Sequence, residues 1–284
     1  MEASNINLQQ LRKEYHKTIC QRLLGYQTTG IPNIADPRSK ISIQIAHSIL
    51  VRMGFPLCSK LPEEQLVHRL FESLTLDYLQ RVFLSIQHLR PGKWIFSTYN
   101  DAPTFDEYEY MSDLAGTLEQ DYDSLAILRD HFVIPGILIG RSPVSDQQIN
   151  QDAEILLGHT ATLTPLRAAN SPEPRPILHA SISCKWTIRS DRSQNARTEG
   201  LNLIRNRKGN TPHIAIVTAE PMPGRIASVA LGTGDLDCVY HMALYELGES
   251  IEALGDETSS EMFNLLVNGK RLRDISDLPF DLAI

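Results

Sequence analysis

Lys185 and the two serines before it are the residues whose types and spacing first suggest chemistry. Ser181, Ser183 and Lys185 alternate with apolar residues, and this period of two predicts a β-strand with the polar groups on one face. A lysine at the end of a buried strand needs a partner, because a desolvated ammonium is costly. Placed beside a phosphate, the same ammonium could stabilise the charge that develops during phosphodiester hydrolysis.

Three charged residues follow within four positions, at the expected start of a helix. Arg189 and Arg192 are of the type that binds guanine O6 and N7 through two hydrogen bonds, and Asp191 is of the type that accepts from the cytosine amine. Phosphate chemistry beside G·C readout indicates a sequence-specific nuclease. The alternative is structural: Lys185 in an ion pair, and the Arg-Ser-Asp-Arg run as a solvated helix N-terminus whose dipole favours Asp191.

Longer stretches around these residues match a known family. The stretch 181–209, continued at 218–221 and 230–234, resembles the NgoMIV-type restriction endonucleases, which belong to the CCGG-cutting branch of the PD-(D/E)xK nucleases. The similarity recurs at 87–92 and 267–279, so it covers most of the chain. The resemblance implies a type II restriction endonuclease that binds double-stranded DNA and cleaves it with Mg²⁺, leaving 5′ overhangs.

The resemblance also implies an active site of carboxylates and a lysine. Lys185 would orient the water or stabilise the phosphate, and Ser183 shares its strand. Glu199, fourteen residues after Lys185, matches a carboxylate that the family places on the following helix, and Glu72 matches a glutamate that supports the metal site. Carboxylates of this kind hold Mg²⁺, and the carbonyl of Cys184 is expected as a further metal ligand. Without the resemblance, Glu72 would be interpreted as a surface glutamate on a helix.

One position departs from the family pattern. Pro135 is present, but Gly136 follows it where the family has the aspartate that bridges the metal. Glycine has no side-chain oxygen to offer a cation, so position 136 would be a ligand only as an aspartate. We therefore expect an endonuclease whose DNA reader is intact and whose metal site is incomplete. The alternative is a sequence-specific DNA-binding protein without nuclease activity.

Five residues match the family's readers of the major groove. Arg189, Asp191 and Arg192 match the readers of the inner CCGG, and Arg225 with Asp36 matches those of the outer G·C pair. Their joint presence predicts the six-base palindrome GCCGGC. A palindromic site implies a two-fold symmetric dimer, and the resemblance adds a homotetramer, a dimer of dimers that engages two DNA sites.

Further matches concern the minor groove. Gln65 matches a glutamine that reaches it, and Arg38 or Ser39 matches a serine. Taken without the resemblance, Asp36 would be interpreted as a turn residue ahead of Pro37. The whole chain would then be a structural or small-molecule protein with a charged surface.

The bulk composition indicates a globular, cytoplasmic protein. The 284 residues include 27 Lys and Arg against 34 Asp and Glu, and the net charge of −7 is evidence against a general nucleic-acid coat protein. Positive charge concentrates locally between 189 and 208. No apolar run approaches the roughly 18–20 residues of a membrane span, and the N-terminus lacks a signal-peptide pattern. The four cysteines form no close pair, which argues against a zinc ribbon and for reduced thiols.

These groups need a scaffold, and periodicity together with the resemblance predicts an α/β fold. We expect a mixed, five-stranded central sheet flanked by helices, in a single domain over 1–284. The segment 142–176, rich in Pro, Ser and Asn, is expected to be an insertion with one short helix. Strands are predicted at 94–97, at 132–139, up to Lys185 and at 213–218; helices are predicted at 8–24, 41–53, 61–89, 190–207, 237–254 and 261–266.

Overall fold

A mixed β-sheet forms the centre of the protein. The structure is a computed structural model that describes residues 7–98, 104–110, 136–188, 190–232 and 234–284, with the backbone alone over 190–196. In this part of the chain the sheet has six strands in the order β1-β2-β3-β4-β5-β6. Their bounds are β1 Trp94–Ser97, β2 Ile137–Arg141, β3 Ile177–Lys185, β4 His213–Thr218, β5 Cys238–His241 and β6 Leu272–Asp274.

The sheet changes direction at β3, its longest strand. β1 and β2 run antiparallel, as do β2 and β3, whereas β3 to β6 are all parallel. In the register of β3 and β4, Lys185 lies beside Thr218, so both strands end at the same edge. Every residue of β3 between its two ends is buried, as expected for a strand covered by helices on both faces. The predicted mixed α/β architecture is confirmed, with one strand more than expected.

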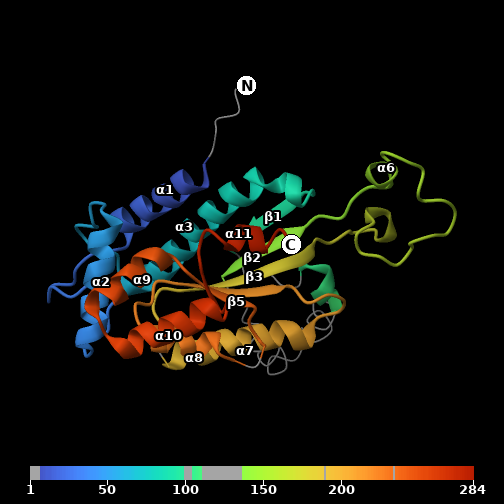
Figure 1. The fold of residues 1–284 in the computed structure, drawn as a ribbon. Helices are drawn as coiled ribbons and strands as arrows, with labels where there is room; N and C mark the ends of the chain where they lie inside the picture. Colours follow the sequence, from blue (N-terminus) through green and yellow to red (C-terminus); the bar gives the residue numbers. More distant parts are fainter. Residues whose placement is uncertain (1–6, 99–103, 111–135, 189, 233) are drawn as a thin grey trace.

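Helices cover both faces of this sheet (Figure 1). α1 (Leu8–Arg22), α3 (Glu64–Ser85) and the short α11 (Leu278–Asp281) lie on one side. The other side carries α7 (Ser190–Asn206), α8 (Pro223–Ala230) and α10 (Glu257–Asn268). α2 (Lys40–Met53) packs against α9 (Leu244–Leu254) at one end of the molecule. Short 3₁₀ turns lie at Gln87–Leu89, Asp106–Tyr108 and Ala168–Asn170.

Local sequence signals explain several helix ends. Ser39 begins α2, since its hydroxyl accepts a hydrogen bond from the Ser42 backbone N–H, and Gly54 ends the helix in the left-handed conformation. Ser39, one candidate for a minor-groove contact, therefore already has a capping role. Among the described residues, no helix combines the length and the apolar character that crossing a bilayer requires.

Three predicted elements need correction. The expected helix 237–254 is wrong at its start: Cys238-Val239-Tyr240-His241 forms β5, because β-branched and aromatic residues suit a buried strand. The helix expected over 61–89 spans only Glu64–Ser85. The strand expected at 132–139 is described from Ile137 and continues to Arg141, while 132–135 lies outside the described residues. All four cysteines are free thiols, and three of them are buried.

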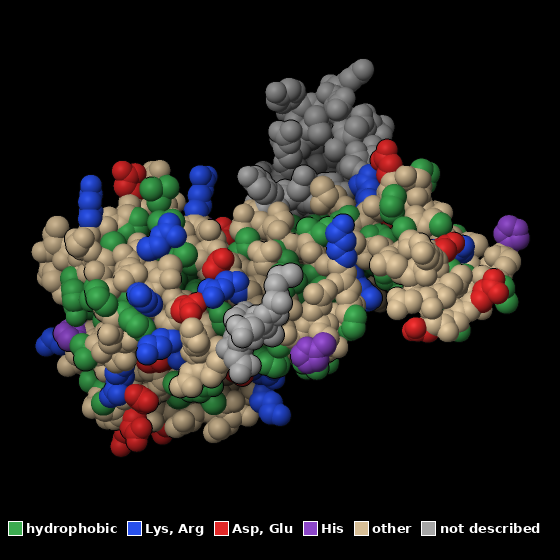
Figure 2. All heavy atoms as spheres, turned by 90° about the horizontal axis from the view of Figure 1, so that it is seen from above, with side chains coloured by type: hydrophobic (Ala, Val, Ile, Leu, Met, Phe, Trp, Pro, Cys, Tyr) green, Lys and Arg blue, Asp and Glu red, His purple; other side chains and the backbone are tan. Residues whose placement is uncertain are grey.

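The predicted insertion is an arm that projects from the body of the protein (Figures 1 and 2). It contains the short helix α6 (Asp146–Ile149), and Arg167 pairs with Asp146 at 2.7 Å across its base. Several large apolar side chains stand open on the arm, with Leu163 94% exposed.

A buried ion-pair network joins three elements. The Arg12 guanidinium of α1 donates to Glu246 of α9 at 2.7 and 2.9 Å and to Asp274 of β6 at 2.7 and 2.9 Å. Asp274 is fully buried. Although burial alone would raise the pKa of Asp274, the hydrogen bonds and charge of Arg12 hold it below its usual range.

Replacing Arg12 should therefore leave a buried carboxylate without its countercharge. We expect Arg12→Leu to lower the free energy of unfolding in urea at neutral pH by about 3–5 kcal/mol. Since the pKa of Asp274 is lowered in the folded state, its contribution is present above the ordinary aspartate pKa and is lost as pH falls through the folded value. The control is Arg52→Leu, whose partner Glu249 has a 61% exposed side chain; that pair should contribute at most about 1 kcal/mol. Equal losses in the two variants would contradict the role given to Arg12.

Candidate active site and nucleic-acid interface

The carboxyl end of β3 carries a compact polar cluster. Lys185 Nζ lies 3.3 and 3.4 Å from the two carboxylate oxygens of Glu199, and the Ser183 hydroxyl donates to Glu199 Oε2 at 3.1 Å. All three residues are largely or fully buried. The structure thus brings together Ser183, Lys185 and Glu199, which the sequence analysis grouped.

The chain path explains how Glu199 reaches the strand. α7 begins at Ser190, five residues after Lys185, and runs back along the face of the sheet (Figure 1). Trp186, directly after the strand, packs edge-to-face on Phe71 of α3 with ring centroids 5.1 Å apart. The segment between strand and helix is therefore anchored on one side of the sheet, while Glu199 returns on the other.

Glu72 approaches the same strand end from α3. Its side chain is buried, which contradicts the interpretation of Glu72 as a surface glutamate. Burial raises the pKa of Glu72, and the Glu199 carboxylate raises it further, against the opposing charge of Lys185. Gly136 precedes Ile137, which pairs with Ile182, so the glycine lies at the strand end next to Ser183.

This donor set suits a hard divalent cation. Among the described residues, no group of three or more His, Cys, Asp or Glu side chains lies close enough to hold a metal. Two carboxylates nevertheless lie near this strand end, Glu199 beside Lys185 and Glu72 against Gly136, and one oxygen, Glu72 Oε1, is buried without a hydrogen-bond partner in the described part of the chain. Mg²⁺ is commonly held by one or two carboxylates, with waters and substrate phosphates completing its shell. The role expected for the Cys184 carbonyl stays a prediction.

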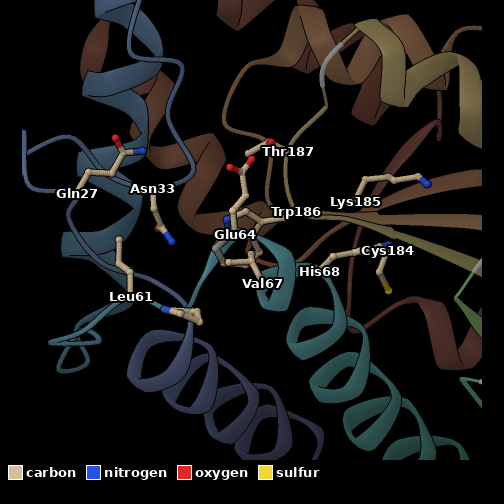
Figure 3. Close-up of a pocket in the computed structure, with 11 residues that line it drawn as sticks. Gln27, Asn33, Leu61, Glu64, Val67, His68, Cys184, Lys185, Trp186 and Thr187 are labelled. Carbon is tan, nitrogen blue, oxygen red and sulfur yellow. The ribbon is translucent and has the colours of Figure 1, made fainter.

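A cleft of about 390 Å³ opens beside Lys185 (Figure 3). One wall is the end of β3 and the residues after it; the other is the start of α3 and the loop before α2. Gln65 lies exposed in the first turn of α3, next to the cleft residue Glu64. The residues that line the cleft are Gln27, Asn33, Leu61, Pro62, Glu64, Val67, His68, Cys184, Lys185, Trp186 and Thr187.

Asp36 and Arg225 form an ion pair, although 189 positions separate them in sequence. Asp36 also accepts a hydrogen bond from the Arg38 backbone N–H at 2.9 Å. This bond and the Arg225 guanidinium hold the pKa of Asp36 below its usual range. Arg225 lies in the first turn of α8, directly after β4. The two predicted readers of the outer base pair are therefore neighbours in space, and both remain partly exposed.

The structure describes no side chain of the three residues predicted to read the inner bases. Arg189 lies outside the described residues, and for Asp191 and Arg192 the backbone alone is described, in the first turn of α7.

Part of the basic stretch 189–208 has structural partners. Arg197 donates to the carbonyls of Ser228 and Leu231 at the end of α8, at 2.8 and 3.1 Å. Lys208 pairs with Glu109 at 3.4 Å. Lys, Arg, Asp and Glu side chains are interspersed over the face seen in Figure 2. In the described part of this stretch, Glu109 thus offsets the charge of Lys208, while Arg197 keeps its charge but is held by carbonyl groups.

Glu220 is a site residue that sequence reasoning did not single out. It is fully buried after β4, and its carboxylate accepts from the backbone N–H groups of Ile188 at 2.9 Å and Met222 at 3.1 Å. Arg225 Nη1 lies 3.9 Å away. Glu220 therefore ties the segment that leads to α7 to the turn that presents Arg225. A charged residue close to the end of a buried strand, as Lys185 also is, was the signal available in the sequence.

Comparisons with known proteins find similarity over nearly the whole chain. A family model described as NgoMIV restriction enzyme matches residues 15–284. The Type II restriction enzyme NgoMIV of Neisseria gonorrhoeae is 42% identical over 282 residues, which cover 97% of this chain and 98% of that protein. A solved complex of the restriction endonuclease PspGI with substrate DNA covers 98% of this chain and 92% of that chain, at 13% identity and a TM-score of 0.25.

The buried Glu220 carboxyl should give stability a specific pH dependence. Burial raises its pKa to about 7, against the opposing backbone N–H groups and Arg225. As pH rises from the ordinary glutamate pKa to about 7, the unfolded chain loses this proton first. The group then lowers the free energy of unfolding by up to about 1.4 kcal/mol per pH unit. Urea unfolding over this pH window should show a shallower decline in Glu220→Gln than in the wild type, whereas the exposed control Glu249→Gln should keep the wild-type slope. An unchanged slope in Glu220→Gln would exclude the raised pKa.

Proposed function

The chain belongs to the NgoMIV family of type II restriction enzymes, and we propose that it recognises duplex GCCGGC and cleaves it with Mg²⁺. Cleavage would be slower than by a chain with an aspartate at position 136. The observation that carries the proposal is the closeness of two charged pairs. Lys185 with Glu199 lies at the end of β3, and Arg225 with Asp36 lies after the neighbouring parallel strand β4. Hydrolysis and base readout would share one edge of the sheet.

Base recognition would use the paired residues together. On binding, the Arg225 guanidinium would turn to guanine O6 and N7, and the Asp36 carboxylate would accept from the cytosine amine of the outer pair. Arg189, Asp191 and Arg192 would read the inner bases from the start of α7, and Gln65 would reach the minor groove beside the cleft. Glu220 would act as a positioning residue, because it holds the backbone that presents Arg225.

Hydrolysis would rest on the cluster at the end of β3. Lys185 would stabilise negative charge on the scissile phosphate, and Ser183 would keep Glu199 oriented through the hydrogen bond already present. A bound Mg²⁺ would supply charge stabilisation and a more acidic water; Glu199 and the Cys184 carbonyl would be its ligands from this strand and helix. The missing carboxylate at Gly136 leaves this set one strand-borne ligand short, which is the reason to expect slower cleavage.

We propose a homotetramer, built as a dimer of dimers, as the working assembly. A palindromic site favours a two-fold dimer, and the arm offers an apolar surface for a further contact, since Ile155, Leu157 and Leu163 are all exposed on it. The chain would act as a single endonuclease domain in the cytoplasm, where it would meet duplex DNA. The second candidate, a DNA-binding protein without nuclease activity, is favoured by one observation, the glycine at 136.

A binding and cleavage experiment separates these two candidates. We expect the chain to bind a GCCGGC duplex about 10³-fold or more tightly than an unrelated duplex at the same salt concentration. With Mg²⁺ it should cut a plasmid carrying two sites faster than one carrying a single site, leaving 5′ overhangs. Lys185→Ala should bind equally well and cut neither plasmid. Specific binding without any cutting would select the second candidate, and binding without sequence preference would exclude both.

Substitution of Arg225 tests which base pair it reads. Arg225→Lys keeps the positive charge but loses the two-pronged contact with guanine. We expect the preference for GCCGGC over ACCGGT to fall by about 1–3 kcal/mol, roughly 5- to 150-fold in relative affinity. Competition binding at constant salt measures this ratio. Arg52→Lys, far from the proposed interface in the surface pair with Glu249, is the control. An equal loss of affinity for both duplexes would assign Arg225 to the phosphate backbone instead.

A further inference from the structure

The space beside Gly136 is occupied by the side chain of Glu72. A Cβ atom built on residue 136 would fall on Glu72 Oε1 and would lie 2.9 Å from Glu72 Cγ. Any other residue at 136 would therefore have to displace this carboxylate. The glycine is thus more than a lost ligand, because its lack of a side chain is what admits Glu72 to the end of the sheet.

The carboxylate that enters this space is not satisfied there. Glu72 is 9% exposed, and its Oε1 atom has no hydrogen-bond partner among the described residues. A buried polar atom without a partner costs about 1–3 kcal/mol, and more if it is charged. A hydrogen-bond donor or a cation bound to Glu72 Oε1 would remove this cost, and the described protein groups supply neither.

The charge balance around Glu72 indicates what kind of partner is missing. Glu72 and Glu199 lie near one ammonium, Lys185, which already pairs with Glu199; the other positive charge near Glu72, on Arg69, forms no ion pair with it among the described residues. The ionised Glu72 carboxylate is therefore left without an ion-pair partner in a buried place, where an isolated charge is disfavoured. A hard divalent cation would neutralise it and use the free oxygen.

We propose that Glu72 takes the place of the strand carboxylate that Gly136 lacks, and that it forms with Glu199 a two-carboxylate site for a hard divalent cation such as Mg²⁺ or Mn²⁺. The inference rests on the proposed function only in the choice of cation. Glu72 and residue 136 then act as alternatives: the chain uses the glutamate from α3 when position 136 is glycine, and an aspartate at 136 would expel it.

A double-mutant cycle tests this dependence through cation binding rather than through cleavage. Mn²⁺ affinity is measured on the full chain, without DNA, by titration calorimetry and by the loss of the free-Mn²⁺ electron paramagnetic resonance signal. We expect Glu72→Gln to weaken binding about tenfold or more in the Gly136 chain. In the Gly136→Asp chain the same substitution should cost less than about threefold, because the new carboxylate already holds the cation.

Gly136→Ala gives an independent test, because it fills the space and adds no charge. It should weaken Mn²⁺ binding about as much as Glu72→Gln, although every carboxylate remains in the chain. Glu63→Gln, which removes an exposed carboxylate at the start of α3, is the matched control and should leave affinity unchanged. Urea unfolding of each variant identifies any variant that does not fold. If Gly136→Ala does not fold, the test rests on Glu72→Gln compared in the Gly136 chain and in the Gly136→Asp chain.

The outcomes are distinct. An equal effect of Glu72→Gln in both backgrounds, no effect in either, or no Mn²⁺ binding by the wild type would overturn the inference. Duplex binding without divalent cations, measured on the same proteins, tests the proposed function separately. If the wild type prefers GCCGGC but Glu72→Gln leaves the Mn²⁺ affinity unchanged, the role of Glu72 is rejected and the proposed function stands. If the wild type shows no preference for GCCGGC, the proposed function is rejected.

Discussion

A buried ammonium has to be neutralised, and the ion pair between Lys185 and Glu199 meets this requirement at the end of β3. The pair constrains the surrounding chain, because Glu199 reaches the strand only if α7 starts directly after it and runs back along the sheet. That course places the first turn of α7 at the edge where β4 also ends. In the proposed enzyme, the contact that holds the catalytic lysine would also fix the direction of the helix that reads the inner bases.

Internal pairing limits the electrostatic contribution that this acidic chain could make to DNA binding. Two arginines are neutralised by carboxylates of the protein itself: Arg12 by Glu246 and Asp274, and Arg225 by Asp36. Arg197 donates to carbonyl groups at the end of α8. The positive charge available to a phosphate backbone is therefore smaller than the composition suggests. Because the chain and DNA both carry a net negative charge, long-range attraction would contribute little, and the hydrogen-bonding geometry of the few freed residues would carry more of the binding.

The scaffold and part of the site could be predicted from the sequence, for physical reasons that particular residues show. The alternation that ends at Lys185 predicts β3, whereas Glu199 was assigned through the family resemblance, which places a carboxylate on the following helix. By contrast, β5 has only four residues, Cys238-Val239-Tyr240-His241, too few for an alternation to be recognised, and the sequence predicts a helix there. The role of Glu220 could not be predicted, because its partners are backbone N–H groups, which leave no pattern in the sequence. A sequence also shows that Gly136 lacks a side chain, but only the packing of α3 on the sheet reveals that Glu72 fills the space.

The ion pair between Asp36 and Arg225 has a consequence for how specificity could change during evolution. The two residues come from a loop before α2 and from α8, and each is the other's partner in the protein without DNA. Replacing either one alone would leave the remaining charge partly buried and without its partner, in addition to losing one half of the base-pair contact. An evolutionary change toward a shorter or degenerate site would therefore pass through a single mutant with lower stability and weaker recognition. Asp36 and Arg225 would tend to change together, by coupled substitutions at two distant codons.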